Sequence, residues 1–166
     1  MTTVAVIGAG QMGAGIAQVV AAHGNAVLLA DIDLATAGKA KAGIEKGLAK
    51  LVAKEKIAAT DAEATLGHIV PVADYARFAE AEFIIEAATE REDIKNKIFE
   101  AIVPHLGPDT ILTSNTSSIS ITRLASRTDR PERFMGFHFM NPVPVMQLVE
   151  LIRGIAPGEE TYAARS

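Results

Sequence analysis

The chain contains no cysteine, which excludes disulfides, thiolate catalysis and a cysteine-type zinc site and agrees with an intracellular protein. We expect no metal ligand set in it. No apolar run reaches the roughly 18 residues that a membrane-spanning helix needs, so the sequence predicts no membrane-spanning helix and no membrane partner. No low-complexity tract interrupts a composition of 49% apolar and 22% charged residues, which is typical of a folded domain.

The first ten residues also lack the basic segment, long apolar stretch and cleavage site of a secretory signal. We therefore expect a cytoplasmic protein. A net charge of −4 gives no general attraction for nucleic acid, so we predict no nucleic-acid partner. Any anionic ligand must be held by a local site. The length of 166 residues predicts one domain.

Short apolar runs alternate along the chain with segments of helical composition. The runs predict strands at 4–7, 26–31, 68–72, 82–86, 110–113, 133–139 and 146–152. Helices are expected between them, at 11–22, 34–56, 61–66, 75–81, 91–103 and 119–126. This alternation predicts an α/β fold, doubly wound around a mostly parallel sheet. The last two strands are too close in sequence for a parallel crossover, so they are antiparallel if they pair.

The glycines of "GAGQMG" follow the first predicted strand and open the first predicted helix, with the spacing G-x-G-x-x-G. Gly8 would allow the tight turn, Gly10 the close approach of a pyrophosphate, and Gly13 the packing of helix on strand. Asp31 ends the next strand, 18 residues after Gly13, where a carboxylate accepts hydrogen bonds from the adenosine ribose and repels a 2′-phosphate. The pattern therefore predicts NAD rather than NADP, although glycines at this spacing also occur in structural turns.

Polar residues follow three further predicted strands. They are Glu86 with Glu90, residues 115–118, and His138 with Asn141. Because ligands of an open α/β sheet bind outside the carboxyl ends of its strands, these groups are expected to converge on one crevice. Each also has a structural interpretation: Glu90 can begin a helix, Ser117 and Ser118 can cap one, Asn141 can begin an Asn-Pro turn, and His138 can be a buried, hydrogen-bonded histidine.

His138 and Glu150 are not brought together by spacing alone. A tight hairpin centred on residues 142–143 would place His138 opposite Gln147 and leave Glu150 about 10 Å away, at ~3.3 Å per residue. A wider turn or a bulge is needed to join them, and the two prolines between the predicted strands favour such an irregular connection.

Four motifs resemble the NAD-binding domain of the 3-hydroxyacyl-CoA dehydrogenases, including the 3-hydroxybutyryl-CoA enzymes: "VAVIGAGQMGAGIA", "EAATEREDIKNKIF", "SNTSSISIT" and "GFHFMNPVPVMQLVELIRG". The resemblance covers essentially the whole chain and implies a Rossmann-type fold. It implies that His138 is the catalytic base, that Glu150 is its carboxylate partner, and that Ser117 lies near the reacting substrate oxygen and the nicotinamide. The NAD-contacting positions it implies are Met12, Asp31, Ala88, Thr89, Glu90, Lys95, Ser117 and Asn141.

The resemblance also implies an acyl-CoA substrate. Lys54 matches a lysine that binds the CoA nucleotide, but Gly47 stands where the family has a serine. A solvated helix face is the alternative for Lys54 and for the other lysines of the predicted helical arm at about 34–66. We expect residues 1–152 to form the NAD-binding domain and residues 153–166 to form a linker into a helical domain that this chain lacks. That domain supplies the family's catalytic asparagine and homodimer contacts.

The predicted function is therefore NAD-dependent oxidation of (S)-3-hydroxyacyl-CoA. Two alternatives remain: a non-catalytic NAD-binding module, and a β-hydroxyacid dehydrogenase that acts on free acids. The second group characteristically uses a lysine base, so the "HFMNP" motif argues against it. Because a helical domain is expected to be missing, the chain alone is predicted to bind NAD with little turnover.

Overall fold

One parallel sheet organises the molecule. The computed structural model describes residues 2–89, 91–115, 120–126, 128–137, 149, 150 and 152. Six strands pair in the order β3-β2-β1-β4-β5-β6, and every neighbouring pair is parallel. Their bounds are β1 (Thr3–Ile7), β2 (Ala26–Ala30), β3 (Ile69–Pro71), β4 (Phe83–Glu86), β5 (Ile111–Asn115) and β6 (Phe134–Phe137). This is the strand order of the doubly wound dinucleotide-binding fold, and it confirms the predicted fold class.

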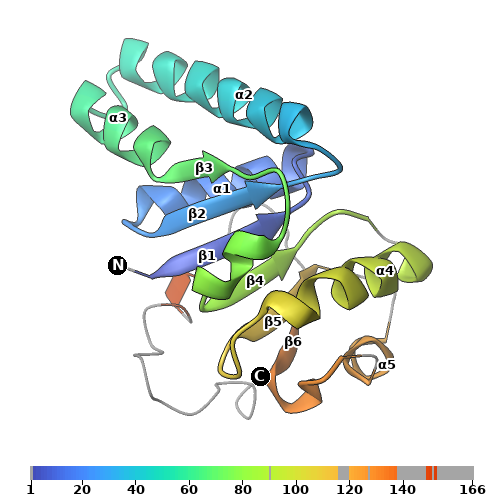
Figure 1. The fold of residues 1–166 in the computed structure, drawn as a ribbon. Coiled ribbons are helices and arrows are strands. Elements are labelled where there is room, and N and C mark those ends of the chain that lie inside the picture. Colours follow the sequence, from blue (N-terminus) through green and yellow to red (C-terminus); the bar gives the residue numbers. More distant parts are fainter. Residues whose placement is uncertain are drawn as a thin grey trace.

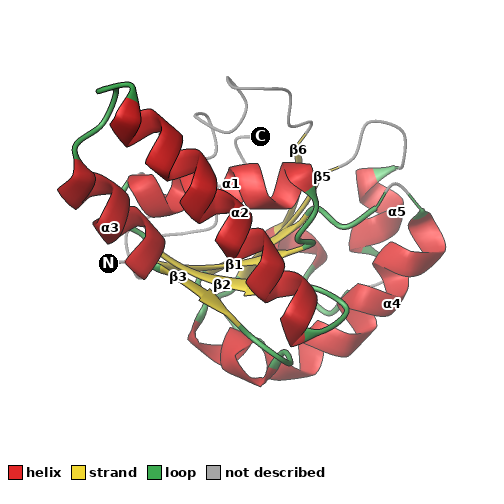
Figure 2. Cartoon of the chain, turned by 90° about the horizontal axis from the view of Figure 1, so that it is seen from above, coloured by secondary structure: helices red, strands yellow, loops and turns green. Residues whose placement is uncertain are grey.

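Helices cover both faces of the sheet, as Figures 1 and 2 show. The labelled α-helices of the described residues are α1 (Gln11–Ala22), α2 (Leu34–Ala53), α3 (Ala59–Gly67), α4 (Glu92–Ile102) and α5 (Ile121–Ala125). Three 3₁₀ helices join them, η1 (Ala76–Glu80), η2 (Val103–His105) and η3 (Pro131–Arg133). Helices α1 and α2 share one apolar core with the sheet, whereas α4 and α5 share the other.

The two cores explain why the strands are continuous apolar runs rather than alternating ones. Val4 and Val6 of β1 face the α1 side, and Ala5 and Ile7 face the α4 side. All four side chains have at most 2% exposure. A strand buried on both faces has no position for a solvated polar side chain until it ends. Polar residues are therefore confined to the strand ends, which is where the candidate site lies.

A helical arm formed by α2 and α3 projects beside β3 (Figure 1). Asp33 caps α2, because its carboxylate accepts a hydrogen bond from the backbone amide of Thr36 at 2.7 Å. Hydrogen bonds from the backbone and side chain of Thr36 lower the pKa of the Asp33 carboxyl. Ile44 and Leu48 anchor α2 to the core. The predicted arm is confirmed, with its two helices separated by a turn in which Glu55 adopts a positive φ of 57°.

The predicted strand at 146–152 is wrong for the residues that the structure describes there. Val149, Glu150 and Ile152 are helical. Val149 and Ile152 are three residues apart, the spacing of one helix face, and both are buried in the core shared with α1. That core also contains side chains of β4, β5 and β6, so the helical residues at 149 and 152 pack on the α1 side of the sheet. An antiparallel strand beside β6 is thus excluded at these residues.

Two smaller differences concern the helices. The segment predicted as a helix at 75–81 is the 3₁₀ helix η1, and the one predicted at 119–126 is reduced to five residues in α5. No helix in the described part of the chain combines the length and apolarity needed to cross a bilayer.

Candidate functional site

The glycine-rich loop joins β1 to α1 at the carboxyl edge of the sheet. Gly8 has φ +107°, and its backbone amide donates to the carbonyl of Ala30 at 2.8 Å. A Cβ at Gly8 would lie 2.8 Å from the backbone of Ala87 and Ala88, and a Cβ at Gly13 would lie 1.6 Å from the Gly8 oxygen. Folding itself therefore requires glycine at both positions, because the loop is tight and α1 packs directly on it.

Gly10 differs from these two glycines. It is the N-cap of α1 with an extended conformation, φ −73° and ψ −172°, and no described atom lies within 4 Å of a Cβ built there. Its helix has no acidic residue in the first turn. Among the described residues, the space beside Gly10 is therefore open at a helix N-terminus, which is the environment that binds phosphate oxygens. Packing of these residues gives no reason for glycine at this position, whereas close approach of a ligand does.

Asp31 follows β2 and points back to the glycine-rich loop. One carboxylate oxygen accepts the Ala9 amide at 2.6 Å and the other accepts the Ile32 amide at 2.6 Å. Each carboxylate oxygen can accept a second hydrogen bond, so the fixed carboxylate still has acceptor sites for a ribose diol. The structure thus brings Asp31 and the glycine-rich loop together, as the sequence predicts.

Large apolar side chains with exposed surface lie next to Asp31 and in the glycine-rich motif along the chain. Among the described residues they include Met12 at 39%, Ile32 at 88% and Leu34 at 49% exposure. Tyr75 is also nearby and half-buried; burial raises the pKa of its phenol, and the negative charge of Asp31 raises it further. Exposed apolar groups beside a fixed carboxylate suit a ligand that is part aromatic base and part sugar.

The ends of β4 and β5 hold a buried polar cluster. Glu86 and Lys95 form an ion pair with no exposed side-chain surface. Ser114 donates to Glu86 at 2.6 Å, and Lys95 donates to the Asn115 carbonyl at 3.0 Å. The sequence placed Glu86 at a strand end and Lys95 on a helix, but it gave no signal that they pair, because they are nine residues apart across a loop.

Several predicted site residues cannot be placed. Glu90, Ser117, His138 and Asn141 lie outside the described residues. Ala88 and Thr89 lie in the loop after β4, and the Ala88 amide donates to Glu86 at 2.8 Å. Glu150 is exposed on a helical segment instead of the predicted strand. The proposed pairing of His138 with Glu150 therefore stays a prediction.

Lys54 is exposed at the C-cap of α2. Asp33 is the N-cap of the same 20-residue helix, and such a helix is about 30 Å long at 1.5 Å per residue. Lys54 is therefore far along the arm from Asp31 and the glycine-rich loop. The structure does not bring it together with the other candidate residues, and its predicted contact with CoA is untested.

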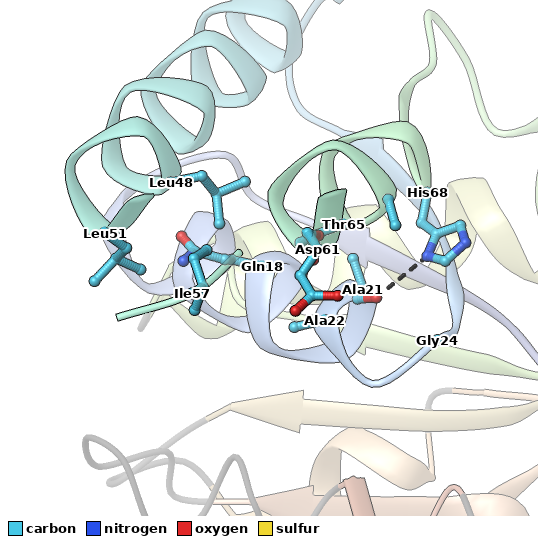
Figure 3. A pocket seen from close by; sticks show the side chains of 11 residues that line it. Gln18, Ala21, Ala22, Gly24, Leu48, Leu51, Ile57, Asp61, Thr65 and His68 are labelled. Carbon is cyan, nitrogen blue, oxygen red and sulfur yellow. Dashed lines mark hydrogen bonds between the residues drawn. The ribbon is translucent and has the colours of Figure 1, made fainter. Parts of the chain in front are cut away.

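A pocket of about 530 Å³ lies elsewhere, between α1, α2 and α3 (Figure 3). Its lining includes Ala21, Leu48, Ile57, Thr65 and His68. In this pocket the His68 ring nitrogen Nδ1 is 3.3 Å from the Ala21 carbonyl oxygen. Since α1 starts at the glycine-rich loop and ends at Ala22, the pocket lies at the opposite end of that helix. It is separate from the candidate site.

Comparison with known proteins agrees with this geometry. The family described as 3-hydroxyacyl-CoA dehydrogenase, NAD binding domain matches residues 3–165. A 3-hydroxybutyryl-CoA dehydrogenase of Bradyrhizobium diazoefficiens is 48% identical over 97% of this chain and 55% of its own length. A 3-hydroxyadipyl-CoA dehydrogenase of Escherichia coli is 48% identical over 95% of this chain and 33% of its own length.

A solved structure shows the same similarity. The (S)-3-hydroxybutyryl-CoA dehydrogenase PaaH1 of Ralstonia eutropha superposes with a TM-score of 0.82 and 44% identity, over 87% of this chain and 51% of that one. The chain spans a third to about half of the length of these relatives. Sequence, fold and the glycine-rich loop with Asp31 together place the chain in the 3-hydroxyacyl-CoA dehydrogenase family, as its NAD-binding domain.

Proposed function

We propose that this chain binds NAD in preference to NADP and serves an NAD-dependent (S)-3-hydroxyacyl-CoA dehydrogenase. The observation that carries the cofactor preference is the fixed carboxylate of Asp31, held by the Ala9 and Ile32 amides beside the glycine-rich loop. It offers acceptors to the ribose hydroxyls and repels a 2′-phosphate. The open space at Gly10 and the N-terminus of α1 accommodate the pyrophosphate.

NAD, held by the glycine-rich loop and Asp31, would supply the hydride acceptor. Neutral His138 would take the proton of the substrate 3-hydroxyl as C3 loses its hydride, which would give a 3-oxoacyl thioester. In the reverse direction the imidazolium returns that proton. Glu150 fixes the tautomer of the ring and stabilises its cation, and Ser117 hydrogen-bonds the reacting oxygen. These roles rest on membership of the family and on the match of each residue to its motif.

A CoA thioester is the proposed substrate class. The two relatives described above are named for different acyl groups, hydroxybutyryl and hydroxyadipyl, and for the same CoA carrier. The carrier is therefore the common element, and Lys54 is proposed to bind its nucleotide. From the same family membership we propose that the protein forms a homodimer through a further helical domain and that it is cytoplasmic.

A substrate panel tests this function against both alternatives. The complete gene product is assayed for NADH oxidation at 340 nm with acetoacetyl-CoA and with acetoacetate. The proposal expects turnover with the thioester at least about 100-fold faster than with the free acid, since loss of remote binding energy lowers the rate itself. Faster turnover of acetoacetate would support the β-hydroxyacid alternative. NADH binding without turnover of either compound would support a non-catalytic module.

A further inference from the structure

Three segments meet at the buried carboxylate of Glu86. Its Oε1 accepts from Lys95 Nζ and from Ser114 Oγ, the latter at 2.6 Å, and its Oε2 accepts from the Ala88 amide at 2.8 Å. Lys95 Nζ also donates to the Asn115 carbonyl at 3.0 Å. We call Glu86, Ala88, Lys95, Ser114 and Asn115 the Glu86 network. The side chains of Glu86, Lys95 and Ser114 have no exposed surface.

The Glu86 network borders the candidate cofactor site on two sides. Glu86 and Ser114 are register partners near the carboxyl ends of β4 and β5, and Lys95 lies on α4. Ala88 belongs to the loop after β4, whose backbone lies within 2.8 Å of a Cβ built at Gly8. The Glu86 carboxylate thus joins the loop that touches the glycine-rich loop to Ser114, near the carboxyl end of β5.

The stability of the fold does not by itself require charged and polar side chains at Glu86, Lys95 and Ser114. Two charges removed from water lose their hydration, and an apolar pair of similar volume at such a place is often equally stable. An apolar pair does not, however, direct hydrogen bonds to fixed atoms. The carboxylate of Glu86 accepts three bonds from three different segments, which fixes the relative position of those segments.

We propose that Glu86 and Ser114 are positioning residues of the cofactor site. The network holds the loop after β4 and the end of β5 in one arrangement, and NAD binds to that arrangement. Glu86 and the Asn115 carbonyl also accept two of the three N–H donors of Lys95, and these bonds fix the position of its ammonium group. The proposal rests on the proposed function, in which NAD occupies the crevice at these strand ends.

Ser114 and its neighbour Thr113 provide a matched test. Thr113 is equally buried, and its hydroxyl donates to the Ile84 carbonyl of β4 at 2.9 Å, outside the Glu86 network. Ser114→Ala and Thr113→Val each remove one buried hydroxyl bond between β5 and β4. NADH dissociation constants and Tm values are measured for both variants, for Lys95→Met, and for Glu86→Gln/Lys95→Met. In the double variant the amide oxygen can still accept from Ala88.

The proposal expects the dissociation constant for NADH to rise at least 3-fold in Ser114→Ala and at least 10-fold in the double variant. Thr113→Val should stay within 2-fold of the wild type despite a lower Tm. Equal dissociation constants for Ser114→Ala and Thr113→Val would overturn the proposal and reduce the network to a structural role. A loss of affinity in Lys95→Met with none in Ser114→Ala would also overturn it, in favour of direct contact. A wild type that does not bind NADH would reject the proposed function itself.

Discussion

Cofactor preference provides a quantitative test of the role of Asp31. Its carboxylate is held by amides at 2.6 Å on both oxygens, so it cannot turn away from a ligand without breaking those bonds. A 2′-phosphate about 4 Å away would be repelled by about 1 kcal/mol per unit charge in water and about 4 kcal/mol at an effective dielectric constant of 20. With screening we expect about 1 to 3 kcal/mol, which corresponds to roughly 5- to 150-fold in affinity.

The perturbation is Asp31→Ser, with Asp33→Ser as its control. Both remove one negative charge by the same substitution, but Asp33 caps α2, a role that serine also performs. In the wild type, NADH should bind at least tenfold more tightly than NADPH. Asp31→Ser should weaken NADH binding and bring the two dissociation constants within about threefold of each other, because the repulsion and a charge-assisted hydrogen bond are both lost. Asp33→Ser should keep the wild-type ratio.

Isothermal titration calorimetry of the four combinations of variant and cofactor, beside the wild type, measures these constants. Comparable affinities of the wild type for NADH and NADPH would refute the assignment of Asp31. The same change of ratio in Asp33→Ser would show that the effect is general charge rather than a specific contact.

Four further predictions concern the glycine-rich loop, Tyr75 and Glu150. Gly13→Ala should destabilise the fold by about 3 kcal/mol or more, because its Cβ would meet the Gly8 oxygen at 1.6 Å, whereas Gly15→Ala, with no described atom within 4 Å, should stabilise it slightly. Gly10→Ala should leave Tm unchanged and weaken NADH binding at least about tenfold if the space belongs to the pyrophosphate; unchanged binding would refute that. Burial and Asp31 raise the pKa of Tyr75 above its ordinary 10.0, so the unfolded chain ionises first and stability should fall as the pH rises above that value. Tyr75→Phe should lose less stability between pH 9 and 11 in thermal melts, and equal losses would contradict the shift. Glu150→Gln in the complete gene product should lower kcat about tenfold or more with a smaller change in NADH affinity, and equal losses in both would argue against its role beside His138.

The sequence predicted the parts of the site that lie close together along the chain. Glycine spacing and a carboxylate after the second strand are local patterns, and both occur where they were expected. Glu86 is different, because its side-chain partners lie on α4 and β5 and meet it only in the folded chain. A single glutamate after an apolar run gives no sign of that network.

The segment around Glu150 was predicted as a strand, but its described residues are helical. Its apolar residues allowed both a strand and a helix, and a short apolar run does not separate the two. Burial decides the outcome, since Val149 and Ile152 are both buried in the core that α1 shares with the sheet. That requirement depends on the arrangement of the whole sheet, so it could not be seen in the local sequence.

His138 provides the most direct test of the central claim, that this chain carries the acid-base group of a hydride transfer. The measurement is the rate of NADH oxidation by acetoacetyl-CoA in His138→Ala and in the wild type, together with the dissociation constant for NADH, in the complete gene product. A lost general acid or base costs typically about 100- to 10,000-fold in rate, while cofactor binding through the glycine-rich loop and Asp31 should change less than about threefold. Unchanged turnover in His138→Ala, or an equal loss of turnover and NADH affinity, would contradict the account.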